Sequence, residues 1–213
     1  MSQIKRIVAI VLILAMTLCV GLEAFAAGSP TVGPEFDPTT GKVTEESQGT
    51  TLQYDVYKKA ITSIQSKGQV ATYTVDTVID QTGKETPVDT FGDDAQGVFD
   101  SVQGRQITTV TFKHGTTLKS KSLKRSKVKK IVAEGPISIE KGAFLKTLEK
   151  KPKIYAKGIK KASEFKVEQG AFKGTTGGKI YVSKDMSSKE FKKLQKKLTK
   201  AGFKGKLVRS AEF

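Results

Sequence analysis

Cysteine occurs once in this chain of 213 residues, as Cys19 in an apolar stretch near the N-terminus. Beyond that stretch the sequence excludes disulfides, thiol nucleophiles and thiolate metal sites. A domain without disulfides has to be held together by its core. Tryptophan is absent, and histidine occurs once. The sequence also lacks zinc-ligand spacing, a phosphate-binding glycine loop and a nucleophile elbow, so none of these common catalytic motifs is present.

Charged residues are missing from Ile7 to Leu22, directly after a basic pair. Small alanines follow at 24, 26 and 27, in the sequence Ala-Phe-Ala-Ala. A basic start, an apolar run and small residues at its exit are typical of a secretory signal peptide. We predict that residues 1–27 form such a peptide, cleaved after Ala26 or Ala27. The mature chain is then extracellular or held at the cell surface.

Two other interpretations of the N-terminus are less consistent with the sequence. An uncleaved membrane anchor needs about 20 apolar residues, whereas the uncharged run has sixteen. A lipoprotein signal has a small residue before its cysteine, whereas Leu18 precedes Cys19 here. We therefore expect membrane contact only through the signal peptide before cleavage.

Charge is distributed unevenly along the chain, which carries +16 overall. Residues 28–100 contain five Lys and twelve Asp or Glu, a net −7. Residues 101–213 contain thirty Lys or Arg and eight Asp or Glu, a net +22. Such asymmetry favours an anionic partner for the C-terminal half. The alternative is that lysine only keeps the solvent face of a repeat soluble.

The N-terminal part of the mature chain has few regular patterns. Residues 28–51 are rich in Gly, Pro, Thr, Ser and Glu, which predicts a disordered linker. Residues 52–64 fit either a short helix or a strand. Residues 70–79 alternate and are β-branched, which predicts a strand, and residues 80–96 read as a loop. We assign 52–104 to an N-terminal strand or cap region with an irregular first repeat.

From Ile107 onward the chain repeats itself. The hexapeptide at 139–144 (Ile-Glu-Lys-Gly-Ala-Phe) matches the one at 167–172 (Val-Glu-Gln-Gly-Ala-Phe), and a weaker copy ends at Phe99. A fourth, degenerate copy is Leu118 followed by Ser122-Leu123, and a short apolar strand follows each of the four copies. The central residues of these strands are separated by 21, 23 and 26 positions: Val110, Ile131, Ile154 and Ile180. Such periods predict a leucine-rich repeat solenoid over residues 105–213, an α/β repeat fold with short parallel strands.

The repeats also predict how the core is filled. Stacking places each strand beside the next and directs Phe99, Phe144 and Phe172 inward as a ladder. The Gly-Ala step before each phenylalanine allows a tight backbone turn.

The last repeat is followed by a predicted capping helix. Ser187 and Glu190 have the spacing of a capping box at its start, and Gly202 is placed to end it. Residues 203–208 then form a final strand. One face of the helix is apolar: Phe191, Leu194 and Leu198. A terminal helix shields the open end of a solenoid core. A lysine-rich helix can also lie on an anionic membrane, but this apolar face is narrow and lacks Trp.

These residues resemble the BspA-like leucine-rich repeat family of bacterial surface and secreted proteins, with an ending similar to that of Gram-positive members. The likeness rests on Gly-Ala-Phe at 142–144 and 170–172, on the strands that follow, and on the closing segments 180–184 and 201–206. It covers roughly residues 70–213. The resemblance implies a right-handed solenoid, export, and binding or adhesion instead of catalysis. It does not supply a ligand, because the ligands of the family vary.

The chain departs from this family pattern at three repeat positions. The first strand position is Lys151 in one repeat and Gly177 in another, and Leu123 replaces a phenylalanine. The repeats are also few, so the face they offer to a ligand is small.

Residues between the apolar strand positions point outward and align from repeat to repeat. The predicted columns are Thr109, Lys130, Lys153, Lys179; Thr111, Val132, Tyr155, Tyr181; and Lys113, Glu134, Lys157, Ser183. From them we predict one candidate ligand face: Lys130, Lys153, Tyr155, Lys157, Lys179 and Tyr181. Ring faces suit sugars or bases, and ammonium groups suit carboxylate or phosphate. The alternative is that Tyr simply suits a strand and Lys keeps the face soluble.

We therefore predict a non-catalytic binding or adhesion module, monomeric and without a metal or cofactor, whose partner is a protein or an anionic cell-wall or host glycan. Nucleic acid is the alternative polyanion, although arginine is scarce and export argues against a genomic role. A glycoside hydrolase using Asp93 and Asp94 is a further alternative. The same aspartates with Asp89 form a candidate calcium site. His114 is interpreted as a surface residue in a turn.

Overall fold

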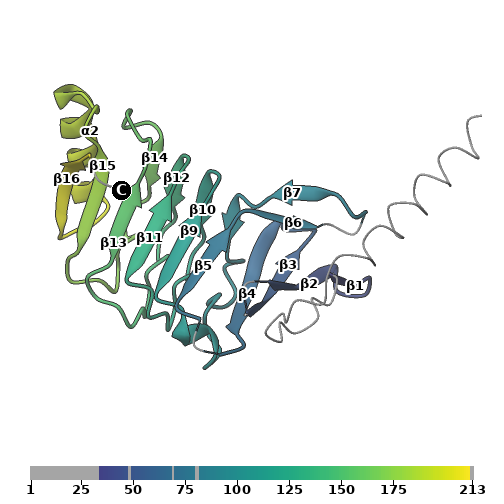
Figure 1. Ribbon diagram of the computed structural model, residues 1–213. Coiled ribbons are helices and arrows are strands. Elements are labelled where there is room, and N and C mark those ends of the chain that lie inside the picture. The colour runs from purple at the N-terminus through teal and green to yellow at the C-terminus, as the bar shows by residue number, and fades with distance from the viewer. Residues whose placement is uncertain (1–33, 48, 69, 80–81, 212–213) are drawn as a thin grey trace, which may run out of the picture. The chain divides into compact units, whose positions relative to one another are not determined.

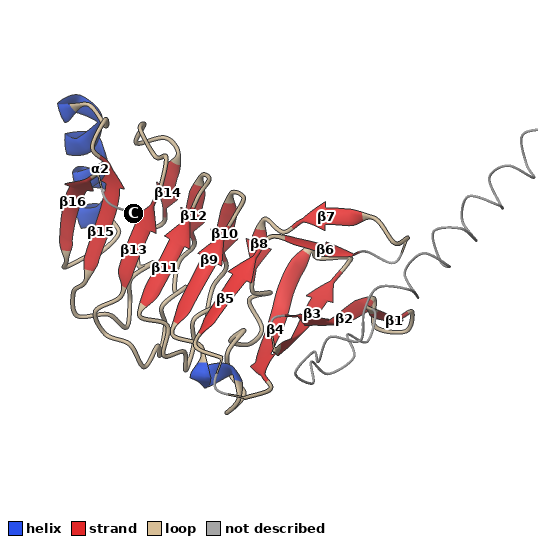
Figure 2. Cartoon of the chain, viewed as in Figure 1, coloured by secondary structure: helices blue, strands red, loops and turns tan. Residues whose placement is uncertain are grey.

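The computed structural model describes residues 34–47, 49–68, 70–79 and 82–211. These residues belong to one compact unit, Val32–Phe213. The predicted signal peptide at 1–27 and the first residues of the predicted linker lie outside them. Strands in parallel and mixed sheets dominate the described part of the chain, and an α-helix lies near the C-terminus (Figures 1 and 2).

A six-stranded sheet holds the repeated apolar strands. All of its strands are parallel, in the order β16-β15-β13-β11-β9-β5. They are β5 (Thr72–Val75), β9 (Thr109–Phe112), β11 (Lys130–Ala133), β13 (Lys153–Ala156), β15 (Lys179–Ser183) and β16 (Lys206–Ser210). Val110, Ile131, Ile154 and Ile180 are direct neighbours on successive strands. The predicted strand register is thus confirmed, and Figure 1 shows β5 to β15 side by side.

A second sheet of eight strands is antiparallel at one end and parallel at the other. Its order is β1-β2-β3-β4-β8-β10-β12-β14. The antiparallel strands are β1 (Glu35–Asp37), β2 (Lys42–Ser47), β3 (Thr50–Asp55) and β4 (Ala60–Ser66). The parallel strands are β8 (Thr90–Phe91), β10 (Thr116–Leu118), β12 (Ile137–Ile139) and β14 (Phe165–Val167). A separate antiparallel pair consists of β6 (Thr77–Ile79) and β7 (Glu85–Pro87), and a 3₁₀ turn spans Gly104–Gln106.

One continuous apolar core contains side chains from both large sheets. Phe144 and Phe172 are buried and their rings stack at 5.4 Å between centroids, which confirms that part of the predicted ladder. Phe99 is also buried, but its ring contacts Phe91 at 5.5 Å. The reason is that the turn containing Leu123 lies between the turns containing Phe99 and Phe144. Val98 N–H donates to the Ser122 carbonyl, and Leu123 N–H donates to the Ala143 carbonyl. The aromatic ladder is therefore interrupted at Leu123.

The predicted linker is the main difference between sequence and structure. Within 28–51 the structure has strands β1, β2 and the start of β3. Val43 is buried and lies opposite Tyr54 of β3, so the antiparallel pairing provides the apolar contact that the local sequence lacks. The extent of the linker was overestimated because a short strand of polar residues is ordered by its neighbours in the sheet.

Residues 52–64, which fitted either a helix or a strand, belong to the β3–β4 hairpin. The strand expected at 70–79 is present but divided at Asp76 into β5 and β6, which belong to different sheets. The loop expected at 80–96 contains the short strands β7 and β8. Two or three residues are too few to give a periodic pattern in the sequence.

The turns that follow β10, β12 and β14 share a left-handed backbone position. Gly142 and Gly170 have φ of +77° and +82°, as the Gly-Ala-Phe motif predicts. Their amide groups stack, because Lys121 N–H donates to the Gly142 carbonyl and Gly142 N–H donates to that of Gly170. Lys121 holds the equivalent position with φ +59° although it carries a side chain. The turn after β10 thus has the same left-handed backbone conformation, although lysine stands there in place of glycine.

The α-helix, α2 (Ser188–Lys200), is bounded as the sequence predicts. Ser187 is the N-cap, and its hydroxyl accepts from Glu190 N–H. At the other end Gly202 N–H donates to Thr199 and Phe203 N–H donates to Leu198, the pattern of a Schellman motif. The Glu190 carboxylate does not follow the simple capping box, since it accepts from the distant Ala162 N–H. The cap therefore also fixes the helix to the turn before β14.

Candidate ligand-binding face

The outward face of the six-stranded sheet carries a row of lysines. The register places Lys130, Lys153, Lys179 and Lys206 directly opposite one another on β11, β13, β15 and β16. We call these four residues the lysine row. All four are exposed, whereas the next residue along each of the first three strands is buried, as expected for alternating strand faces. Three of the four were predicted from sequence. Lys206 lay in the predicted final strand, but only its pairing with Lys179 assigns it to the row.

A row containing two tyrosines lies beside the lysine row on the same face. Tyr155 and Tyr181 are opposite each other and half-buried, and their rings are nearly parallel, 4.5 Å apart between centroids at 7°. Lys130 Nζ lies 4.8 Å from the centroid of Tyr155. Partial burial, together with the adjacent Tyr181, raises the pKa of the Tyr155 phenol. The two rings stack on each other, so the ring faces between them are not available to a ligand.

The third predicted column is largely neutralised. Glu134 lies between two lysines, 3.2 Å from Lys113 Nζ and 3.9 Å from Lys157 Nζ. Ser183, at the end of the column, is buried with 8% of its surface exposed. Lys157 therefore shares Glu134 with Lys113 as an acidic partner, unlike the other lysines of the candidate face.

The lysine row has no such neutralisation. None of the ion pairs among the described residues includes Lys130, Lys153, Lys179 or Lys206. Neighbouring strands lie about 4.8 Å apart, so the row spans about 15 Å with one positive charge at each step. Like charges directly opposite each other destabilise a sheet. An anionic ligand along the row would remove that repulsion.

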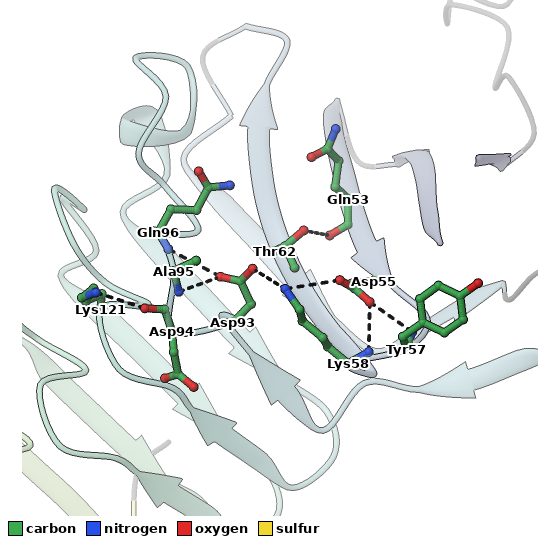
Figure 3. Close-up of polar contacts among 10 residues, drawn as sticks. All are labelled: Gln53, Asp55, Tyr57, Lys58, Thr62, Asp93, Asp94, Ala95, Gln96 and Lys121. Atoms are coloured by element: carbon green, nitrogen blue, oxygen red, sulfur yellow. Dashed lines mark hydrogen bonds and ion pairs between the residues drawn. The ribbon is translucent and has the colours of Figure 1, made fainter. Parts of the chain in front are cut away.

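Asp93 and Asp94 both have hydrogen-bond partners within the protein (Figure 3). Asp93 Oδ2 accepts from Lys58 Nζ at 3.0 Å, and Asp93 Oδ1 accepts from Ala95 N–H at 3.1 Å. Burial alone would raise the pKa of the Asp93 carboxyl, but these hydrogen bonds outweigh it and the pKa is lowered. A general acid in glycoside hydrolysis needs a raised pKa. The Asp93 carboxylate instead fixes its loop to the β3–β4 hairpin.

The neighbouring carboxylates also have structural roles. Asp94 Oδ1 accepts from Ser120 N–H at 2.9 Å, and the Asp94 carbonyl accepts from Lys121 Nζ. Asp55 Oδ1 accepts from the N–H groups of Tyr57 and Lys58 in the hairpin turn (Figure 3). No group of three His, Cys, Asp or Glu in the described part of the chain is arranged to hold a metal ion. The candidate calcium site with Asp89 therefore has no structural support.

His114 lies at an exposed strand end. Its Nε2 is 2.8 Å from Asp76 Oδ1, and both side chains are exposed. The contact connects the residues that follow β9 and β5, which are neighbouring strands of the six-stranded sheet. Its position agrees with the interpretation of His114 as a surface residue.

Comparisons with known proteins return no relative of this chain. No family model matches it, and no curated protein and no solved structure gives a significant match. In the described residues, no helix has both the length and the apolar character needed to span a bilayer.

Proposed function

We propose that this protein is an exported, non-catalytic binding module whose outward sheet face, centred on the lysine row and on Tyr155 and Tyr181, binds an anionic polymer. The observation that carries the proposal is the lysine row, four aligned ammonium groups without acidic partners among the described residues. The signal-like N-terminus supports export of such a module, and acidic wall polymers and glycans are then candidate anions.

We further propose that the two sheets belong to a short solenoid of the leucine-rich repeat type, with α2 as its terminal cap. Three features support this assignment: sequence periods of 21 to 26 residues, parallel strands in register, and stacked left-handed turns. In a solenoid each repeat contributes one step to a continuous surface. The lysine row is then a direct consequence of repetition.

The geometry favours a polymer over a small anion. A row of about 15 Å exceeds the reach of a single carboxylate or phosphate group, whereas a chain with repeated charges meets several lysines at once. Lysine ammonium groups act as point charges without the fixed fork of arginine. The face therefore suits a ligand with closely spaced negative charges and does not select one particular geometry of anionic group. The tyrosine hydroxyls at 155 and 181 add hydrogen-bonding groups beside the charges.

The test is retention of the mature chain on purified cell-wall polymer, heparin and DNA at rising salt. The variant Lys153→Gln/Lys179→Gln removes two charges from the row. Its matched control, Lys189→Gln/Lys192→Gln, removes two exposed charges from α2. We expect the first variant to elute at clearly lower salt on the preferred polymer and to reduce the salt slope by about two on DNA. The control is expected to elute close to the unmodified protein.

Salt-insensitive retention, or equal losses in both variants, would contradict the proposal, because binding through a defined lysine row must weaken with salt and depend on position. Strongest retention on DNA would favour the nucleic-acid alternative. Tyr155→Ala/Tyr181→Ala then measures how much the tyrosine pair adds. A contribution from the pair predicts weaker retention with an unchanged salt slope, since neither side chain carries charge.

A further inference from the structure

A second basic feature lies at the other sheet, between β14 and α2. A groove of about 770 Å³ is lined by Lys166, Val167, Gln169, Lys197, Lys200 and Ala201. We call it the helix groove. β14 is the terminal strand of the eight-stranded sheet, so its outer edge is not occupied by another strand there. The lysine row belongs to the six-stranded sheet, and the two features share no residue.

The lining of the helix groove is positive and has no acidic side chain. Lys166, Lys197 and Lys200 line it, and Gln169 contributes an amide that can donate. The Lys197 ammonium donates to the carbonyl of Ala162, a residue of the second hollow on the same helix. Val167 and Ala201 add apolar surface. An adjoining hollow of about 490 Å³ along the same helix contains Glu190. That carboxylate is already bound by Lys193 Nζ and Ala162 N–H, both at 2.8 Å.

Hydrogen bonds hold the two walls of the groove together. Lys197 Nζ donates to the Ala162 carbonyl at 2.8 Å, and Gly170 N–H donates to the Ala201 carbonyl at 3.1 Å. With the Glu190 contact to Ala162, these bonds fix α2 to the turns before and after β14. A site fixed in this way loses little conformational freedom when a ligand binds.

The helix dipole opposes an anion here, but its effect is smaller than that of the lysines. The C-terminal end of a helix carries roughly half a negative charge, located on its free carbonyl groups. In α2 the carbonyls of Lys197, Leu198 and Thr199 already accept from Ala201, Phe203 and Gly202. The full positive charges of the lysines that line the groove therefore outweigh the dipole.

We infer that the helix groove binds a compact ligand with several adjacent phosphate groups, through Lys166 and Lys200, beside Lys197, whose ammonium also bonds to the Ala162 carbonyl. Lysine suits phosphate as a point charge, and several ammonium groups near one another favour a multiply charged anion over a single carboxylate. The volume lies in the range of small-molecule sites, roughly 300–1,000 Å³. The phosphate groups can come from a soluble oligophosphate or from lipid headgroups. A preformed groove between β14 and α2 suits a small soluble anion, so we commit to the soluble oligophosphate.

The test is calorimetric titration of the mature chain with inorganic tripolyphosphate at low salt. Lys166→Gln/Lys200→Gln changes two exposed groove residues and leaves the structural contact of Lys197 intact. The matched control is Lys189→Gln/Lys192→Gln on the same helix, outside the groove lining. We expect saturable binding that the groove variant weakens at least about tenfold and the control by less than about twofold. Unchanged thermal unfolding of both variants establishes that they fold.

Three results would overturn the inference: no saturable binding, equal losses in both variants, or binding only to vesicles of phosphatidylcholine with phosphatidic acid. The last would assign the groove to a membrane surface. Lys153→Gln/Lys179→Gln separates this inference from the proposed function. That variant is expected to retain tripolyphosphate binding within about twofold while losing polymer retention, so each proposal can fail without the other.

Discussion

The phenol of Tyr73 is buried in β5, with 4% of its surface exposed. Burial, reinforced by the nearby Glu45 carboxylate, raises its pKa from 10.0 to about 12. The folded state therefore keeps this proton at pH values where the unfolded chain has lost it. The stability linked to Tyr73 is complete below pH 10 and is lost as the pH rises from 10 to 12.

Tyr73→Phe tests this linkage at the scale of one residue. Two pKa units correspond to at most about 3 kcal/mol of unfolding free energy. We expect the variant to lose about 1 kcal/mol at pH 7, because the hydroxyl contact with Thr50 is removed. Between pH 10 and 12 it is expected to lose stability less steeply than the unmodified protein. Denaturant unfolding at pH 7, 10 and 11.5 measures both effects, and parallel curves for the two proteins would contradict the assignment.

Single charged residues differ in how far their roles could be predicted. Lys153 and Lys179 were placed on one face by the repeat pattern alone, and their register is confirmed. Lys157 was placed beside Glu134 in the third predicted column, and the structure adds that the two side chains form an ion pair. The ion pair between Lys58 and Asp93 joins positions 35 residues apart, and no sequence pattern connects them. Such contacts depend on register between distant strands, which local periodicity does not encode.

The stacked turns are the element in which backbone and sequence disagree most clearly. A side chain in the left-handed region costs roughly 1–2 kcal/mol relative to its usual conformation, a cost that glycine avoids. Lys121 accepts this cost at φ +59°, beside Gly142 in the next turn. The hydrogen bonds between successive turns hold the conformation in place.

Lys121→Gly is therefore expected to stabilise the fold, by about 0.5–1 kcal/mol after the flexibility of glycine in the unfolded chain is included. The reverse change, Gly142→Lys, places a side chain at φ +77° and is expected to destabilise by about 1 kcal/mol or more. Chemical denaturation of both variants measures the difference. If Lys121→Gly lowers the free energy of unfolding, the contact of Lys121 Nζ with the Asp94 carbonyl outweighs the backbone strain.

Other elements show where sequence patterns suffice. The ends of α2 were predicted because a cap serine and a terminal glycine act within one turn of the helix. The segment from β1 to β3 was not predicted, since its order comes from pairing with β4 and not from its own apolar content.

At the scale of the whole molecule, the main electrostatic feature is the opposite net charge of the two halves of the chain. Residues 28–100 carry −7 and residues 101–213 carry +22. Each half repels itself, and within the second half the lysine row adds like charges at neighbouring strand positions. Self-repulsion of this kind lowers stability and is screened by salt.

We expect the melting temperature to rise by about 2–4 °C between about 0.01 M and about 0.15 M NaCl, as the screening length shortens from roughly 30 Å to 8 Å. Lys153→Glu places an acid between Lys130 and Lys179 and is expected to melt higher at low salt with a smaller salt response. The same change is expected to weaken polymer binding. A variant that loses both stability and binding would indicate a folding defect in place of a lost charge.

The sequence by itself determined the repeated strands, the inward phenylalanines, the glycine turns and the limits of the terminal helix, because each depends on residues close together in the chain. Only the tertiary structure decided which lysines are free and which are paired, that Lys206 joins the row, that Asp93 binds Lys58, and that β14 and α2 enclose a groove. These features arise where strands and turns distant in sequence meet. Their chemistry is therefore a property of register and packing and not of local pattern.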